Sequence, residues 1–305
     1  MSYLLPEQTI SPTNTGSPLL LPTPDLFARR GKRFRQLSEG HSLGSWLNYL
    51  ATVSDIQQAA LDRLSSAPFD WFHQLQPSEL QDAPSVLAKV ASIYEVLASQ
   101  KPVVAAANTG LTEAAPAPVL SEAELKSSVT RNRDLAQGLT DGSDRNLNDL
   151  MVAAAMQVVW TAVAQQVKAT NLNPTNSELC PVCGSAAVGS IVLAGEGKSG
   201  LRFQHCCLCS SRWNVVRAHC TLCEDGSKVQ YLSLQDKHQA IAAETCEHCH
   251  GYAKISFQDK DLEVDPVADD LATLALDVLV GEEGMGRAAP NLFLCEGKTS
   301  GILAE

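Results

Sequence analysis

The residues of this chain whose types and spacing could do chemistry are cysteines in its C-terminal half. Eight of them form four C-x-x-C pairs: Cys180/Cys183, Cys206/Cys209, Cys220/Cys223 and Cys246/Cys249. Two residues between thiolates let one tight turn present both sulfurs to a single ion. Two such turns facing each other make a tetrahedral four-sulfur site, which both zinc and mononuclear iron accept. The spacing therefore predicts two four-cysteine metal sites.

The four pairs also form an internal repeat. Twenty-two residues separate the first pair from the second and, again, the third from the fourth. Each cysteine of the first set recurs 40 positions later in the second set, as a duplicated unit would place it. The repeat favours a metal shared by the first and second pairs and another shared by the third and fourth. An interleaved arrangement, with the first pair beside the third, is the alternative.

Two cysteines and several histidines stand outside this set. Cys207 competes with Cys206 for one position, but the repeat and the spacing to Cys209 select Cys206, so Cys207 is predicted to point away from the metal. Cys295 is alone in the C-terminal tail. Eight cysteines fill two sites, so we expect the nearby histidines to be supporting or surface residues: His205, His219, His248 and His250. Filled sites leave no open position for hydrolytic chemistry, and we predict no catalytic or cofactor-binding residue.

Length and charge set the broad class. A chain of 305 residues accommodates about two ordinary domains, and 45% hydrophobic residues are enough for a core. A net charge of −11 argues against broad nucleic-acid binding. The N-terminus lacks the features of a secretory signal, and the apolar stretch at 150–167 is interrupted by glutamines, so we expect a buried helix and no membrane span. These features predict a cytoplasmic protein, where closely spaced cysteines bind metals more often than they form disulfides.

The elements that must position the cysteines follow from periodicity. Apolar residues at three-and-four spacing predict helices that begin near Asp25, Ser42 and Val86. Ser121 and Glu124 form a capping box at the start of a further helix. A long helix is predicted over about 144–170, and the basic run at 29–35 is predicted to be the solvated face of a surface helix.

From Cys180 onward, short aliphatic runs and glycines predict strands and turns, and Asp265-Pro266 opens a closing helix. The predicted fold class is α+β: an all-helical N-terminal domain, two tandem metal ribbons and a C-terminal helix. The predicted parts are a disordered arm (1–24), a helical domain (25–174), a first metal module (175–218), a second metal module (219–260) and a C-terminal helix and tail (261–305). The helical part carries its own apolar stripes and is expected to fold independently of the ribbons.

Several segments resemble the FdhE-type formate dehydrogenase accessory proteins. The segments in the metal half are GLRF at 200–203, HCCLC at 205–209 with Trp213 after it, and ETCEHCHGYAK at 244–254. The others are RFRQL at 33–37, GHSL at 40–43, Leu50-Ala51 and LDVL at 276–279. The resemblance covers roughly residues 25 to 295. Cys207 and Ala253 depart from the family pattern, and neither is a predicted metal ligand.

The resemblance implies rubredoxin-like sites, with iron favoured as the bound metal and zinc as the alternative. It implies a cytoplasmic assembly factor, not an enzyme, whose partner is the molybdenum-containing catalytic subunit of formate dehydrogenase before its export. A rubredoxin-like electron carrier is the alternative function. A nucleic-acid-binding ribbon is disfavoured, because residues 178–260 carry eight Lys/Arg and eight Asp/Glu and so offer no basic track.

Overall fold

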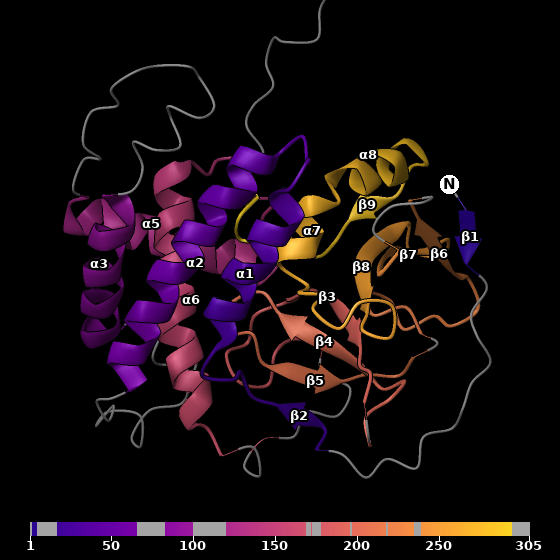
Figure 1. Cartoon of the computed structure of the whole chain (residues 1–305), viewed down its shortest axis with the longest axis horizontal. Helices are drawn as coiled ribbons and strands as arrows, with labels where there is room; N and C mark the ends of the chain where they lie inside the picture. The colour runs from indigo at the N-terminus through magenta and orange to yellow at the C-terminus, as the bar shows by residue number, and fades with distance from the viewer. Residues whose placement is uncertain are drawn as a thin grey trace, which may run out of the picture.

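A computed structural model of the chain (Figure 1) describes residues 2–4, 17–65, 83–99, 120–168, 172, 178–195, 197–217, 219–234 and 239–294. Its N-terminal half contains α1 (Leu26–Ser38), α2 (Gly44–Ser65), α3 (Pro84–Ala98), α5 (Glu122–Ala136) and α6 (Leu147–Gln166). The predicted capping box of Ser121 and Glu124 is present at the start of α5. A second capping box, of Asn146 and Asp149, begins α6. The predicted α+β architecture, with a helical N-terminal region before a sheet, is confirmed.

Helix α6 is the central helix, with α2, α3 and α5 packed around it. Every residue from Asp149 to Ala164 is buried. A helix that is apolar on all sides requires neighbours on all sides. By length and composition α6 could also cross a membrane, but 89% of its apolar window is buried inside the fold. It is a buried core helix, as its glutamines suggested.

The basic run on α1 was predicted to be a solvated face, but two of its arginines are ion-paired with the C-terminal part of the chain. Arg30 is fully buried, and its Nε lies 3.1 Å from Asp265 Oδ1. The Nη2 of Arg33 lies 2.6 Å from Asp269 and 2.7 Å from Asp261. The helix therefore uses part of its positive charge to bind the acidic segment 261–269. The prediction failed because the acidic partners lie more than 220 residues away in the sequence.

The C-terminal half is a sheet built from the repeat. Its main strands are β3 (Ala187–Val192), β4 (Arg202–Cys206), β5 (Arg212–Asn214), β6 (Val229–Ser233), β7 (Ile241–Cys246) and β8 (Gly251–Phe257). Their order in the sheet is β6-β7-β8-β3-β4-β5. Each copy of the 40-residue unit is a three-stranded antiparallel meander, and parallel pairing of β8 with β3 joins the two copies. The two tandem modules thus share one continuous sheet.

Short elements at the chain ends complete the sheet. Strand β1 (Ser2–Leu4) pairs with β6, and β2 (Leu19–Leu20) pairs with β5. These segments differ from the predicted disordered arm, because β2 extends the open edge of β5 and Leu19 is buried there. Residues 5–16 of that arm lie outside the described residues. Strand β9 (Gly286–Arg287) pairs with β8, and the predicted closing helix is divided into α7 (Ala268–Ala272) and α8 (Leu274–Glu282).

One hydrophobic core joins the two halves of the molecule. Figure 1 shows the helices on one side, the sheet on the other and α7 between them. The largest cluster of buried residues contains Leu47 of α2, Val158 of α6, Leu271 of α7 and Trp213 of β5. All four cysteines of the first set belong to the same cluster. The helical half therefore does not have a core of its own, in contrast to the expectation of independent folding.

Candidate metal centres

The first four predicted ligands form a buried cluster. The Sγ atoms of Cys180, Cys183, Cys206 and Cys209 all lie within 4.8 Å of one another. Cys180 and Cys209 are 3.5 Å apart, and Cys183 and Cys206 are 3.4 Å apart. Each of the four side chains is at most 3% exposed. This first centre is sealed from solvent by the helices on one side and by its own meander on the other.

The other four predicted ligands form a second, more open cluster. Cys220, Cys223, Cys246 and Cys249 again have sulfurs within 4.8 Å of one another. The distance from Cys220 to Cys249 is 3.9 Å, and that from Cys223 to Cys246 is 3.7 Å. Cys249 is exposed and Cys223 is half-buried. The structure groups the pairs sequentially, first with second and third with fourth, and not in the interleaved arrangement.

Both clusters fit a tetrahedral ion. Zinc–sulfur bonds of about 2.3 Å in a tetrahedron put the sulfurs about 3.8 Å apart. The sulfur separations of 3.4 to 3.9 Å for the paired cysteines lie close to that value. Four thiolates are a donor set that zinc and mononuclear iron both accept. Each cluster can therefore hold one metal ion.

The C-x-x-C turns direct backbone N–H groups at the sulfurs. The amides of Leu208 and Cys209 each donate to Cys206 Sγ at 3.4 Å, and that of Leu222 donates to Cys220 Sγ at the same distance. Such bonds favour the thiolate, the form that binds metal. The two units also share their turn geometry, since Gly184 N donates to the carbonyl of Cys180 just as Glu224 N does to that of Cys220.

Each turn ends in a left-handed residue. The residue after the second cysteine has positive φ in all four turns: Gly184 (73°), Ser210 (59°), Glu224 (60°) and His250 (54°). The last three are the only non-glycine residues with positive φ in the described part of the chain. This conformation costs a non-glycine residue about 1 kcal/mol or more, so the surrounding contacts must hold it. The sequence indicated the left-handed position only at Gly184.

Burial acts against ionisation of three thiols of the first cluster when no ion is bound. Loss of solvent raises the pKa of Cys180, Cys206 and Cys209 above the ordinary thiol value. Metal binding must then displace protons from these sulfurs. Ion affinity and folding of the turns are consequently linked to each other and to pH.

Cys207 lies beside the first centre without joining it. Its Sγ is 3.7 Å from the carbonyl oxygen of Ala136, at the end of α5, as expected for a thiol directed away from the metal. The carbonyl oxygen of Cys207 accepts a hydrogen bond of 2.9 Å from Gln157 Nε2 on α6. Sequence reasoning missed Gln157, whose signal is a polar residue at the middle of an apolar helix. Cys295 lies outside the described residues.

Among the described residues, none of these four histidines belongs to either cysteine cluster. His205 is fully buried, and its Nδ1 accepts a hydrogen bond of 2.9 Å from Arg212 Nε. Burial and the Arg212 cation lower the pKa of His205 well below its ordinary value, so this ring is neutral. The other three histidines are exposed: His219, His248 and His250.

A buried ion pair joins the two modules. The Nη2 of Arg202 on β4 lies 2.8 Å from Glu244 Oε1 on β7, and both side chains are at most 3% exposed. Tyr231 donates a hydrogen bond of 2.9 Å to the other carboxylate oxygen of Glu244. Removal of one partner would leave a buried charge uncompensated, so this pair fixes how the meanders are joined. No local sequence pattern indicates it.

The fold and the two cysteine clusters together define the class of protein. The chain combines a helical domain with a duplicated, rubredoxin-like sheet that carries two four-cysteine centres, one sealed and one open. Sequence models of three segments of one family match it in order: FdhE, N-terminal, over residues 17–177; FdhE, central domain, over 179–217; and FdhE, C-terminal domain, over 218–294. The chain belongs to the FdhE family.

Relatives and a solved structure are similar over most of their length. A protein named "Protein FdhE homolog" from Edwardsiella ictaluri is 38% identical over 301 residues, covering 92% of each chain. "Protein FdhE" from Escherichia coli is 33% identical over 295 residues, also covering 92% of each. The crystal structure of the FdhE protein from Pseudomonas aeruginosa superposes with a TM-score of 0.68 at 30% identity, covering 92% of this chain and 99% of that one. The resemblance inferred from the motifs is confirmed.

Proposed function

We propose that this chain is a cytoplasmic accessory protein for the maturation of formate dehydrogenase, and that it binds the catalytic subunit of that enzyme before export. The observation that carries the proposal is membership of the FdhE family over residues 17–294. The family's association with formate dehydrogenase suggests the partner, and the match extends over both the helical half and the two metal modules.

The two centres support a role without turnover. We propose that the eight clustered cysteines each ligate one of two ions, with iron favoured by the family resemblance and zinc as the alternative. Four sulfurs complete a tetrahedral coordination sphere and leave no open position for a substrate. The ions would hold the turns in place, and the surface that the turns support would contact the partner.

A co-purification experiment tests this function. Tagged chain expressed with the formate dehydrogenase catalytic subunit should retain that subunit, and the double variant Cys180→Ser/Cys220→Ser should lose it. Cys207→Ser is the matched control, because Cys207 lies outside both clusters. A host that lacks the gene should make the enzyme's polypeptide in inactive form, and the parent chain and the control variant should both restore activity. Full enzyme activity without the gene would contradict the proposal.

A second function, electron transfer to a partner, is favoured by one observation. The second centre is open, with Cys249 exposed and Cys223 half-buried. Bound iron would supply one-electron chemistry at such a surface site. An anaerobic visible spectrum, followed by titration with a reductant, tests it: a reversible iron–thiolate spectrum supports the carrier, and zinc in both sites excludes it.

A further inference from the structure

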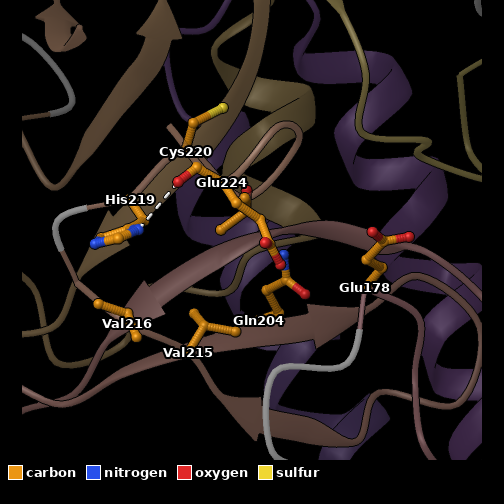
Figure 2. Close-up of a pocket in the computed structure, with 8 residues that line it drawn as sticks. Glu178, Gln204, Val215, Val216, His219, Cys220 and Glu224 are labelled. Atoms are coloured by element: carbon orange, nitrogen blue, oxygen red, sulfur yellow. Dashed lines mark hydrogen bonds between the residues drawn. The ribbon is translucent and has the colours of Figure 1, made fainter. Parts of the chain in front are cut away.

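An open pocket of about 300 Å³ lies beside the second metal centre, between the two modules. Its lining comes from three parts of the chain: the residue Glu178 before the first turn, the region of β4 and β5, and the turn that begins at Cys220. In Figure 2 the Cys220 sulfur points away from the groups that gather lower in the pocket. Cys220 lines the pocket, but most of the surface that a molecule there would meet comes from the other lining residues.

The pocket holds several hydrogen-bond acceptors, alongside the Gln204 amide, the Thr221 hydroxyl and the His219 ring, which can also donate. Gln204 on β4 is only 6% exposed, and its Oε1 is buried without a hydrogen-bond partner. A buried carbonyl oxygen without a donor is costly, and native proteins rarely leave one unsatisfied. Figure 2 shows Glu224 extending toward Gln204, with Glu178 on the other side. An amide oxygen and two carboxylates require a ligand that brings several donors.

The two carboxylates of the pocket, Glu178 and Glu224, form no ion pair with another described residue. Arg202, the nearby buried cation, is already bound to Glu244. Four thiolates outweigh the charge of a divalent or trivalent ion, so each proposed metal centre adds negative charge to this region. A cationic donor group is the complementary ligand.

The remaining walls are apolar. Val215 and Val216 line the pocket on the side opposite Glu178 (Figure 2). Val216 is 53% exposed, and Leu222 in the neighbouring turn is 41% exposed. Apolar surface inside the pocket suits the aliphatic stem of a long basic side chain. The apolar surface continues beyond the pocket rim, where it could contact the residues that flank such a side chain in a polypeptide.

Glu224 occupies the left-handed position at the end of its turn, as Ser210 and His250 do in theirs. Glu224 has a φ of 60°, and the corresponding residue of the first unit is Gly184. A glycine would satisfy this turn without strain, and a glutamate there carries its carboxylate into the pocket. The carbonyl oxygen of Glu224 lies 3.1 Å from His219 Nδ1, which helps to hold the turn (Figure 2).

We propose that this pocket binds an arginine side chain from an extended segment of a partner polypeptide. The guanidinium meets Gln204, Glu178 and Glu224, and the stem packs on Val215 and Val216. Arginine is preferred over lysine because its planar fork offers five donors to acceptors on different sides. The inference rests on the proposed function only in assuming a polypeptide partner. Its test needs no formate dehydrogenase, so the two can fail separately.

Calorimetric titration of the metal-loaded full chain tests the proposal. The probes are the peptide acetyl-Ala-Val-Arg-Val-Ala-amide, the same peptide with glutamine in place of arginine, and N-acetyl-arginine amide. We expect the arginine peptide to bind about tenfold more tightly than either of the others. Equal affinity for the glutamine peptide, or equal affinity for the single amino acid, would overturn the proposal.

Charge-neutral variants locate the binding. Glu178→Gln and Glu224→Gln should each weaken arginine-peptide binding several-fold, up to about tenfold. Glu282→Gln makes the same charge change on exposed α8, outside the pocket lining, and should leave binding unchanged. Two bound metals per chain in every variant establish that the fold is intact. Equal loss of affinity in the Glu282 variant would show a general charge effect and would contradict a built site.

Discussion

The amide of Gln157, in the middle of α6, donates a hydrogen bond of 2.9 Å to the carbonyl oxygen of Cys207, inside a metal-binding turn. Gln157 Oε1 in turn accepts a hydrogen bond of 3.1 Å from Gln57 Nε2 on α2. These buried contacts connect two helices to the first centre. They place the sealed centre and the helical core in one structural unit.

Replacement of Gln157 tests this connection. Gln157→Leu should lower the free energy of unfolding by about 1–3 kcal/mol, because it leaves the buried Cys207 carbonyl without its donor. Gln166→Leu, at the exposed end of the same helix, is the matched control and should change stability by about 0.5 kcal/mol or less. Chemical unfolding followed by circular dichroism measures both. Equal effects would mean that the hydrogen bond does not couple the helix to the turn.

The cysteine doublet gives a second prediction. Cys206→Ser should lose about one metal per chain, because Cys206 is one of the four clustered sulfurs. Cys207→Ser should retain both ions, because its thiol faces the end of α5. Metal analysis of the two purified variants compares them directly. Retention of both ions by the Cys206 variant, with loss from the Cys207 variant, would reverse the assignment.

The unequal surroundings of the two centres give a third prediction. Cys180 belongs to the core cluster that contains the helices, and Cys220 does not. Cys180→Ser should therefore lower the midpoint of helix melting, whereas Cys220→Ser should leave the helices largely unaffected. Thermal unfolding of the two variants, followed by circular dichroism at a wavelength that reports helix, measures this difference. Unchanged helices in the Cys180 variant would restore the picture of an independently folding helical domain.

The buried charge cluster around Asp270 predicts a pH effect. Burial alone would raise the pKa of Asp270, but the Arg287 and Lys254 cations lower it from 3.8 to about 2. Its contribution to stability is therefore complete above about pH 4 and is lost as the pH falls toward 2. Asp270→Asn should cost about 3 kcal/mol at pH 6, where it leaves buried cations unpaired, and less below pH 4.

Urea unfolding at a series of pH values measures this difference. Acid displaces metal from both chains, so the comparison between parent and variant isolates the carboxylate. Asp259→Asn, at an exposed position, is the control and should show little difference at any pH. A parent-to-variant difference that stays constant down to pH 2 would contradict a lowered pKa at Asp270.

The local features of this protein were predictable from sequence. The 40-residue offset between Cys180 and Cys220 requires only counting, and it anticipated the pairing of turns that the structure shows. The capping box at Ser121 and Glu124 is equally local, since four consecutive residues determine it. Helix α6 was recognisable because its apolar residues cover every side.

The contacts between distant segments were not predictable. Arg30 appeared to be a surface cation because its buried partner, Asp265, is 235 residues away. Leu19 appeared to belong to a disordered arm because nothing near it indicates that the edge of β5 is free to accept a strand. The shared core was unpredictable for the same reason, because apolar stripes on separate segments do not reveal which of them pack against each other.

Native mass spectrometry of the purified chain tests the central claim most directly. Two four-cysteine centres predict a folded mass that exceeds the metal-free mass by two ions, and an acid-denatured sample should lose both. Cys220→Ser should carry one ion, held in the sealed first centre. A parent chain that binds no metal, or that contains disulfides between Cys180 and Cys183 in place of an ion, would contradict the account.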